Sequence, residues 1–433
     1  MKQLTAIVIG AGNRGGTYAH HMAATPEKYR IVAVADPNPA DRAYICDLYN
    51  IPAENCFETW EDILDRPKMA DIALIATVDD LHYAPAMKAI SLGYDLLLEK
   101  PVAITARHCA DIARAAKEKG VRVLVCHVLR YTRFYGAVKK LLMQNTIGQV
   151  VSVDMVEAIG NTHFAHSYVR GNWHNLKNSA PMLLAKSCHD LDIVQWLLDK
   201  PCLRVSSFGS LTHFRPENAP EGAPHSCVDG NCPARNSCPY DCLRFYAGLK
   251  PTNGWRHTVA SGIAASRCEP TWEDILQGLR TKNYGVCVYH SDNDVVDHQV
   301  VQMEFEGGVT ASLTVNAFNR GGRYIRIYGT KGELYAFMAS KEIELYTFED
   351  KKKTSVSLDE MDEHITGGHG GGDAGIVNEM YEYFCGNYTG FRAADIQVSV
   401  KNHMIGFAAE EARLSGTVVS LGEYLHSYDL ENW

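Results

Sequence analysis

The sequence predicts an α/β fold that begins with a doubly wound parallel sheet. Two observations support this prediction. An apolar run at 6–9 leads directly into a G-x-G-x-x-G turn at 10–15, and strand-like and helical patterns then alternate as far as residue 125. The 433 residues are too many for one ordinary core, so we expect two domains.

The glycine turn is typical of a strand that enters a helix beneath a bound dinucleotide. Gly10 permits the tight turn, Gly12 lets the backbone approach a pyrophosphate, and Gly15 allows close packing of helix and strand. Unpaired N–H groups at the start of the helix favour phosphate binding. We therefore expect Gly10, Gly12, Asn13, Arg14 and Gly15 to bind the cofactor.

Asp36 follows the second apolar run, 31–35, and lies 21 residues after Gly15. A carboxylate at this distance accepts hydrogen bonds from ribose hydroxyls and repels a 2′-phosphate, so it favours NAD over NADP. The structural alternative is a cap for a helix beginning near residue 39, and the two roles are compatible. Arg42 is the residue that could accommodate a 2′-phosphate.

Further elements continue the alternation. The expected strands are 72–76, 94–98 and 121–125, and the expected helices are 82–92 and 106–119. Ligands bind beyond the carboxyl ends of such strands. The candidate cofactor contacts there are Thr77, Asp80, His82, Glu99 and Lys100.

Lys100 is an unusual residue immediately after a buried strand. Its ammonium could hydrogen-bond a substrate hydroxyl or a developing alkoxide, and the alternative is a surface pair with Glu99. Arg130 and Tyr131, in the segment after the last of these strands, are candidate substrate contacts.

Composition restricts the class of protein. Hydrophobic residues make up 46% and charged residues 21%, and no apolar run approaches the roughly 18 residues that cross a bilayer. The net charge of −9 disfavours nucleic acid and anionic membranes as partners. No signal peptide is evident, so we expect a cytoplasmic protein whose 13 cysteines are reduced or bind metal.

Several stretches together carry a family resemblance. They are GAGNRG, the terminal Asp36, IATVDDLHYAPAMKAISLGYDLLLEKP, HDLDIVQWL and RYIRIYGTKGEL, and with them the chain resembles the Gfo/Idh/MocA family of NAD(P)-dependent oxidoreductases. The resemblance implies a Rossmann domain over 1–130. It also implies a C-terminal α/β domain over 131–433, with a large, mostly antiparallel open sheet that binds substrate and forms a homodimer or homotetramer. The implied substrates are sugars and cyclitols.

The stretch 181–198, PMLLAKSCHDLDIVQWLL, predicts one amphipathic helix. The resemblance implies that this helix carries an Asp and, four residues later, a His, which join Lys100 as the catalytic group. His189 matches the histidine, whereas Ala185 stands where the Asp is expected, and Lys186 follows it. We predict Lys100, His189 and Lys186 as catalytic residues, with a structural helix histidine as the alternative for His189.

Other candidate substrate contacts come from the second domain. Arg170 and Trp173 lie in an expected loop at 168–174, where a buried tryptophan anchor is the alternative. Asp292 could contact substrate or cap a turn, and His369 lies in a glycine-rich loop that could be a hinge or a lid. Lys186 and His189 belong to the same predicted substrate set.

Four cysteines cluster as C-x4-C-x5-C-x3-C within an expected insertion at about 214–257. Cys227, Cys232, Cys238 and Cys242 are candidate ligands of a structural zinc ion, and an iron–sulfur cluster and free thiols remain open. Beyond them the expected strands are 150–158, 286–289, 296–305, 309–316, 324–328, 333–337 and 342–346, and the expected helices are 374–385 and 394–414.

Three functions remain open from the sequence. The first is an NAD-dependent oxidoreductase that oxidises a hydroxyl of a sugar, sugar derivative or cyclitol. The second is a redox-assisted glycosidase, in which bound NAD is reduced and then reoxidised around elimination and water addition. The third is a binding protein that uses NAD as a structural ligand, which a functional Lys100→Ala or His189→Ala variant would indicate.

Overall fold

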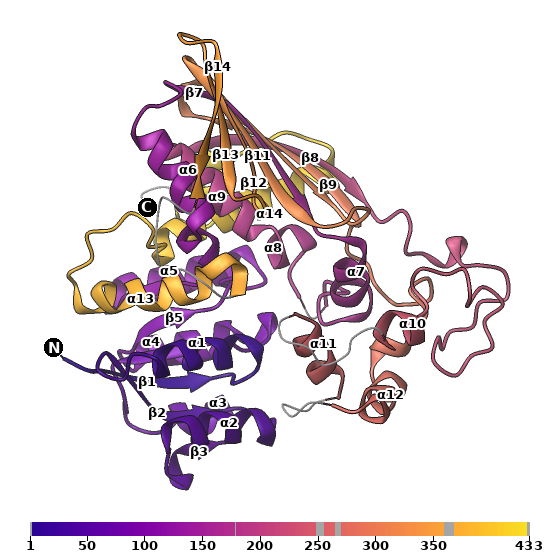
Figure 1. The fold of residues 1–433 in the computed structure, drawn as a ribbon. Helices are drawn as coiled ribbons and strands as arrows, with labels where there is room; N and C mark the ends of the chain where they lie inside the picture. The colour runs from indigo at the N-terminus through magenta and orange to yellow at the C-terminus, as the bar shows by residue number, and fades with distance from the viewer. Residues whose placement is uncertain (1, 178, 248–254, 265–269, 359–367, 431–433) are drawn as a thin grey trace.

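The computed structural model describes residues 2–177, 179–247, 255–264, 270–358 and 368–430. Figure 1 shows two sheets with a layer of helices between them and a group of short helices, α10 to α12, at one side. No helix among the described residues is long and apolar enough to span a membrane.

The first sheet has six parallel strands in the order β3-β2-β1-β4-β5-β6. Its strands are β1 (Leu4–Ile9), β2 (Tyr29–Ala35), β3 (Cys56–Phe57), β4 (Ile72–Ile75), β5 (Asp95–Leu98) and β6 (Val123–Val125). Its helices are α1 (Asn13–Ala23), α2 (Pro39–Tyr49), α3 (Trp60–Leu64), α4 (Tyr83–Ser91) and α5 (Ala106–Lys119). The predicted doubly wound sheet is confirmed, because apolar strands covered on both faces require this alternation.

The second sheet has nine strands in the order β14-β13-β12-β11-β7-β10-β9-β8-β15. They are β7 (Val150–Ala158), β8 (Cys202–Ser210), β9 (His298–Phe305), β10 (Val309–Asn316), β11 (Gly322–Gly329), β12 (Gly332–Phe337), β13 (Glu342–Thr347), β14 (Lys352–Ser357) and β15 (Val419–Ser420). Only the pairing of β7 with β10 is parallel. The expected open, mostly antiparallel sheet is confirmed.

One predicted strand, 286–289, is wrong. Only Val286 forms an isolated bridge there, with Ser226, and the next residues turn away. The carbonyl of Val286 instead accepts a hydrogen bond from Nε of the buried Arg170 at 2.8 Å. A side chain therefore satisfies a backbone group that a sheet partner would otherwise satisfy.

The second sheet is covered on one face by α6 (Arg133–Met143), α9 (Cys188–Leu198) and α14 (Ile396–Ser415) (Figure 1). Alternate residues of β10 are buried, and those between them are partly or fully exposed. The remaining helices are α7 (Asn161–Phe164), α8 (Met182–Ala185), α10 (Cys242–Ala247), α11 (Trp255–Ala264), α12 (Trp272–Thr281), α13 (Gly372–Cys385) and α15 (Leu421–His426).

The helix predicted over 181–198 is two helices, α8 and α9, and the single-helix prediction is corrected here. Lys186 ends α8 and Ser187 leaves helical geometry before α9 begins at Cys188. Lys186 extends toward Glu157 on β7, with Nζ 3.4 Å from Oε1, and its side chain is only 16% exposed. We attribute the break to the need to pair this buried ammonium, which a continuous helix would direct elsewhere.

Helix α13 returns to the first sheet from late in the chain. Ile376, Met380 and Phe384 pack in one apolar cluster with residues of β1, β2 and β4. The hydroxyl of Tyr29 on β2 donates to the carbonyl of Val377 at 2.7 Å. The domain boundary predicted at residue 130 remains a prediction, and the C-terminal segment contributes to the core on both sides of it.

Candidate active site

The three glycines of the turn between β1 and α1 have different steric surroundings. Gly10 has φ +88°, which favours glycine, and a Cβ on Gly15 would lie 1.9 Å from the Gly10 carbonyl oxygen. A Cβ on Gly12 would meet nothing within 4 Å. The space beside Gly12 at the start of α1 therefore fits a pyrophosphate, although cofactor contacts at Asn13 and its neighbours remain predictions.

Asp36 lies at the carboxyl end of β2, beside that turn. Its Oδ2 accepts from the Ala11 N–H at 2.6 Å and its Oδ1 from the Asn38 N–H at 2.8 Å. Asn38, rather than Asp36, caps α2. Arg42 donates to the Asp36 carbonyl oxygen and lies 3.6 Å from a Glu58 carboxylate oxygen, so acidic and carbonyl groups already bind the residue that could accept a 2′-phosphate.

Arg14 and Glu99 form a network beneath the turn. Arg14 Nε donates to Glu99 Oε1 at 2.7 Å, and Arg14 Nη2 donates to Asp373 Oδ1 on α13 at 2.7 Å. The Tyr18 hydroxyl also donates to Glu99 at 2.8 Å. Burial raises the pKa of Glu99, but the charges of Arg14 and Lys100 outweigh burial, and its pKa lies below the usual range. Both predicted cofactor contacts therefore hold the turn to β5 and α13.

Thr77, Asp80 and His82 follow β4, as predicted. The side chain of Thr77 donates to the Leu81 carbonyl at 3.0 Å, and Asp80 is exposed. His82 is 1% exposed, with Nδ1 2.6 Å from the Pro101 carbonyl oxygen and Nε2 3.1 Å from that of Thr77. His82 thus connects the segment after β4 to the segment after β5, and its contact with cofactor remains a prediction.

Lys100 lies at the end of β5 and reaches across to the second domain. Its Nζ donates to the Ala185 carbonyl oxygen at 2.9 Å, where the resemblance implied a carboxylate. A surface pair with Glu99 is excluded, because Glu99 is 4% exposed and its carboxylate binds Arg14 and Tyr18. The ammonium is therefore held at the junction of the two domains.

Asp79 is a site residue that the sequence did not single out. It is 7% exposed, and its Oδ2 accepts from Trp173 Nε1 at 3.0 Å. Burial raises the pKa of Asp79, and the nearby Lys100 ammonium partly offsets that effect. Asp79 and Asp80 are adjacent acidic residues after the same strand, so the sequence does not distinguish their roles. The structure does, because Asp79 is buried and Asp80 is exposed. Trp173 stacks on Tyr168 at 5.9 Å between ring centroids.

His189, on α9, faces other histidines. Its ring centroid lies 6.0 Å from that of His127 and 6.5 Å from that of His369. Burial, and next the charge of Lys100, hold the pKa of His189 well below its usual value, so the imidazole is neutral at physiological pH. Its Nδ1 has no hydrogen-bond partner among the described residues. His189 can therefore accept a proton from a bound molecule.

Lys186 belongs to a buried group of four charges under the sheet. Glu157 on β7 lies 3.4 Å from Lys186, and Arg323 Nε on β11 lies 2.6 Å from Glu157 and 2.8 Å from Asp190. Burial raises the pKa of Asp190 to about 6, although Arg323 opposes this. Burial also lowers the pKa of Lys186. The group includes Asp190 of α9, the helix that carries His189, and Lys186 at the end of α8, whereas Lys100 lies outside it.

His127 was not predicted as a site residue. It is fully buried, and neither ring nitrogen has a hydrogen-bond partner among the residues described. Nδ1 lies 3.6 Å from Asp192, and burial, with the charges of Arg130 and Lys100, lowers the pKa of the ring. The sequence places His127 directly after β6, and the carboxyl ends of neighbouring parallel strands meet at the same edge of the sheet. This position could have identified His127 as a candidate site residue.

Four predicted substrate contacts are buried or paired with protein groups, and their contact with substrate remains a prediction. Arg130 is 2% exposed and bound through two nitrogens to Asp192, at 2.7 and 2.6 Å. Tyr131 is 1% exposed in the core. Arg170 lines a cavity among the cysteines. The carboxylate of Asp292 is 74% exposed and pairs with His174 at 3.1 Å. Each of these side chains is occupied by packing or by protein partners.

His369 has left-handed geometry in the glycine-rich loop before α13. Its Nδ1 lies 3.0 Å from Asp373 Oδ2 and 3.5 Å from Arg14 Nη1. The glycine-rich stretch singled out in the sequence begins at Gly367, which lies outside the described residues. His369 thus joins the cofactor turn to the surroundings of His189, and its contact with substrate remains a prediction.

A cavity of about 180 Å³ opens beside this group. Its lining residues are Ile159, Gly160, Asn161, Thr162, His163 and Arg320. Burial lowers the pKa of His163, and the positive charge of Lys186 is the next cause. It presents amide, hydroxyl, imidazole and guanidinium groups, which suit a polyhydroxylated molecule.

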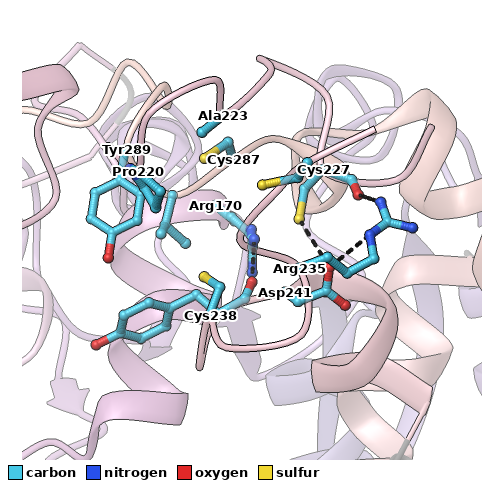
Figure 2. A pocket seen from close by; sticks show the side chains of 12 residues that line it. Arg170, Pro220, Ala223, Cys227, Arg235, Cys238, Asp241, Cys287 and Tyr289 are labelled. Carbon is cyan, nitrogen blue, oxygen red and sulfur yellow. Dashed lines mark hydrogen bonds and ion pairs between the residues drawn. The ribbon is translucent and has the colours of Figure 1, made fainter. Parts of the chain in front are cut away.

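The cysteine-rich segment forms a second, smaller cavity (Figure 2). Cys227, Cys232 and Cys238 line it together with Cys287, whereas Cys242 does not. Among the described residues, no group of three or more His, Cys, Asp and Glu side chains is arranged to hold a metal ion. Elsewhere, Cys46 and Cys56 form a disulfide, which departs from the expectation of reduced thiols.

Family models match most of the chain. Residues 4–127 match an oxidoreductase-family model described as an NAD-binding Rossmann fold. Residues 139–389 match the model of the same oxidoreductase family described as a C-terminal alpha/beta domain.

Individual relatives are distant. The chain is 27% identical to the Bacillus subtilis (strain 168) protein YteT over 379 residues, 82% of each chain. It is 27% identical to 2,7-anhydro-N-acetylneuraminate hydratase of Escherichia coli (strain K12) over 212 residues, 48% of this chain and 54% of that protein. A structure of levoglucosan dehydrogenase with NADH and levoglucosan superposes with a TM-score of 0.69 at 16% identity, covering 97% of this chain and 100% of that one.

Proposed function

This chain belongs to the Gfo/Idh/MocA family of NAD-binding oxidoreductases, and from this premise we propose that it oxidises a hydroxyl of a sugar, sugar derivative or cyclitol with NAD. The observation that carries the proposal is the position of the Lys100 ammonium, bound to the Ala185 carbonyl and close to the neutral His189. A cation beside a neutral base is what the removal of a hydroxyl proton requires.

The cofactor site fits NAD better than NADP. Gly12 leaves open space at the start of α1 for the pyrophosphate, and Asp36 offers a carboxylate at the end of β2 for the ribose. Arg42 is engaged with the Asp36 carbonyl and with Glu58. When bound, the nicotinamide supplies the acceptor for the hydride.

The roles of the side chains follow from their charges. Lys100 stabilises negative charge that develops on the substrate oxygen, and His189 takes the hydroxyl proton. Because Ala185 replaces the expected acid, Lys100 has a carbonyl in place of a carboxylate as its nearest acceptor. Its charge is less neutralised there, which strengthens its attraction for a substrate oxygen.

The substrate class is supported by the cavity and by relatives. The cavity of about 180 Å³ is lined by His163 and by other polar residues suited to binding hydroxyls. The named relatives include enzymes of an anhydro sugar acid and of levoglucosan. Polyhydroxylated ring compounds are therefore the first substrates to test.

The test is a panel of sugars, sugar acids, anhydro sugars and cyclitols assayed by NADH absorbance with NAD and with NADP. We expect NADH formation with a member of the panel, and a loss of kcat of roughly 10²-fold or more in both Lys100→Met and His189→Asn. Val151→Thr, far from these residues on β7, is the matched control. NAD binding without NADH formation from any panel member contradicts the proposal.

A second candidate is the redox-assisted glycosidase. The observation that favours it is the second imidazole, His369, at 6.5 Å from His189 between ring centroids. Elimination needs one group that removes the proton beside the transient ketone and another that protonates the leaving oxygen, and two histidines could share these tasks. One relative is named a hydratase, which is a class of enzyme that adds water to its substrate.

Heavy water separates the two candidates. Aryl glycosides incubated with enzyme and NAD in D₂O gain deuterium at the carbon beside the oxidised centre if elimination occurs. Net NADH then stays near zero while the glycoside is consumed. Stoichiometric NADH with no deuterium at that carbon supports simple oxidation instead.

A further inference from the structure

The cavity of about 180 Å³ lies between two loops at one end of the second sheet. The first loop, 159–163, follows β7, and the second, 317–321, follows β10, which runs parallel to β7. Parallel neighbours end at the same edge of a sheet, so the two loops leave it side by side. The Asn161 N–H donates to the Asn319 carbonyl at 3.0 Å. The backbone therefore joins the two walls of the cavity.

Both walls lead directly into the buried group of four charges. Glu157 lies two positions before the first lining residue, and Arg323 lies three positions after the last one, Arg320. Glu157 and Arg323 are paired across β7 and β11, with Arg323 Nε 2.6 Å from Glu157 and 2.8 Å from Asp190. Asp190 is the neighbour of His189 on α9. The cavity is thus continuous with the elements that position His189.

Packed rings connect the cavity to the first sheet as well. The ring centroid of His163, which lines the cavity, lies 6.2 Å from that of Tyr168. Tyr168 stacks on Trp173, and Trp173 Nε1 donates to Asp79 at 3.0 Å. Asp79 follows β4 at the edge where ligands bind in such sheets. A molecule in the cavity would therefore lie along the path between the two domains.

Arg320 gives the cavity a positive charge. Its side chain is exposed, and it forms no ion pair or hydrogen bond with any residue that the structure describes. The next two arginines along the chain differ in this respect, because Arg323 binds Asp190 and Arg326 binds Glu333, both at 2.8 Å. None of the six described residues that line the cavity is acidic. The charge of Arg320 is therefore not balanced within the cavity.

The size of this charge limits the kind of anion. Burial, and next the charge of Lys186, hold the pKa of His163 well below its usual value, so the imidazole is neutral at physiological pH. Arg320 then supplies a single positive charge, which matches one carboxylate. A phosphate monoester carries about −1.5 to −2 at pH 7, and one guanidinium leaves part of that charge without a partner.

We propose that Arg320 binds a carboxylate of the substrate, so that the enzyme acts on a sugar acid. This inference rests on the proposed function and narrows its substrate class. A guanidinium holds both oxygens of a carboxylate in a planar fork, which fixes the orientation of the bound molecule. The Asn161 amide and the Thr162 hydroxyl, which line the same cavity, are suited to the neighbouring hydroxyls of the sugar.

The first test compares sugar acids with their own amides, for example D-glucuronate with D-glucuronamide, by NADH absorbance. Each of two charge-assisted hydrogen bonds gains about fivefold over a neutral one, so kcat/KM for the acid should be roughly 25-fold higher. Arg320→Met should abolish this ratio, and Arg320→Lys should keep part of it. An unchanged ratio in Arg320→Met, or no preference for acids, overturns the carboxylate subsite and leaves oxidation of neutral sugars intact.

The matched control is Arg204→Met. Arg204 is an exposed arginine that pairs with Glu304 between β8 and β9, at the opposite end of these strands from the cavity. It should keep the ratio of acid to amide. Retained activity of Arg320→Met on the amides shows that this variant is folded.

The second test measures binding without turnover, by calorimetric titration of D-glucuronate into the protein in the presence of NADH. We expect Arg320→Met to weaken this binding by a similar factor while binding of D-glucuronamide stays unchanged. Binding that depends on Arg320 without NADH formation from any sugar would retain the subsite and contradict the proposed function. Equal or unmeasurable binding in both proteins overturns the subsite, and tighter binding of D-glucose 6-phosphate overturns the choice of a carboxylate.

Discussion

At the scale of single residues, burial and the Lys100 ammonium together shift the pKa values of several site residues. The ammonium opposes protonation of His189 and His127 and favours ionisation of Asp79. Its direct acceptor is a backbone carbonyl, so its charge reaches these neighbours without a bound carboxylate to cancel it. The protonation states of the site therefore depend on burial and on this one cation.

The pH dependence of activity follows from His189. Its pKa lies well below 6.5 because burial and Lys100 disfavour the imidazolium, so the base stays neutral until the pH falls well below that value. We expect the acid limb of kcat/KM to have its midpoint below pH 6.5. Histidine NMR titration should also show the His189 pKa rising in Lys100→Met. A limb at or above pH 6.5 contradicts this assignment.

Cofactor preference is decided at Asp36. Asp36→Asn keeps a side-chain acceptor for the Ala11 N–H but removes the charge that repels a 2′-phosphate. A hydrogen bond to a charged group stabilises a complex by about 1 kcal/mol more than a hydrogen bond between neutral groups. The kcat/KM for NAD should therefore fall by about fivefold to tenfold, while the kcat/KM for NADP rises. Asp47→Asn, an exposed change on α2, is the control. An unchanged NAD-to-NADP ratio would remove Asp36 from the ribose site.

Single residues also show how much of the site was predictable. Lys100 and His189 are conspicuous in the sequence as a lysine after a buried strand and a histidine on an apolar helix, and their catalytic roles remain predictions. Asp79 was missed because Asp80 beside it gives the same signal, and only tertiary burial distinguishes them. The ion pair of Arg130 with Asp192 could not be predicted, because Asp192 lies 62 residues away and cannot be identified from local pattern.

At the scale of elements, the junction between the glycine turn and α13 organises the site. Arg14 at the start of α1 binds Glu99 on β5 and Asp373 on α13, and His369 binds the same Asp373. Local sequence patterns predicted each of these elements. Their junction was not predictable, because ion pairs between distant segments leave no periodic signal.

The Arg14–Asp373 ion pair should make the free energy of unfolding depend on pH in the acid range. Burial raises the pKa of Asp373, but the His369 hydrogen bond and the Arg14 charge outweigh burial and hold the pKa below its usual range. A depressed acid pKa contributes stability above the unfolded value near 3.9, and that stability is lost as the pH falls below it. Denaturant unfolding of Asp373→Asn should show a loss of about 3 kcal/mol at pH 7 and a smaller one near pH 3.

The control for this prediction is Glu344→Gln. Glu344 pairs with Lys353 at 2.7 Å in a surface ion pair with side chains 42% and 64% exposed. Such pairs contribute about 0–1 kcal/mol, so the control should be nearly neutral. Equal losses in the two variants, or a loss in Asp373→Asn that does not change with pH, would contradict the proposed linkage.

At the scale of the whole molecule, we predict that the outer face of the nine-stranded sheet is the surface for assembly. Helices α6, α9 and α14 cover the opposite face (Figure 1), while Val156 and Tyr324 lie paired on the outer side of β7 and β11. The open sheet was expected from the family resemblance, and the single parallel pairing inside it was not, because strand order depends on long-range contacts.

We predict a dimer through this face. Val156→Asp places a charge at the centre of the outer face and should yield a monomer by light scattering, since a buried unpaired charge is costly in an interface. Val151→Asp, on the same strand but the opposite face, should leave the assembly intact. A monomeric unmodified protein, or a dimeric Val156→Asp, would show that the face does not carry the contact.

The late return of α13 to the first sheet has a consequence for biosynthesis. The apolar cluster against β1, β2 and β4 includes Ile376, Met380 and Phe384, so the ribosome emits the first strands long before the helix that covers them. An emerging chain of 130 residues would leave that apolar surface open to water and to chaperones. We therefore expect the NAD-binding domain to complete its folding only after α13, late in the chain, has been translated.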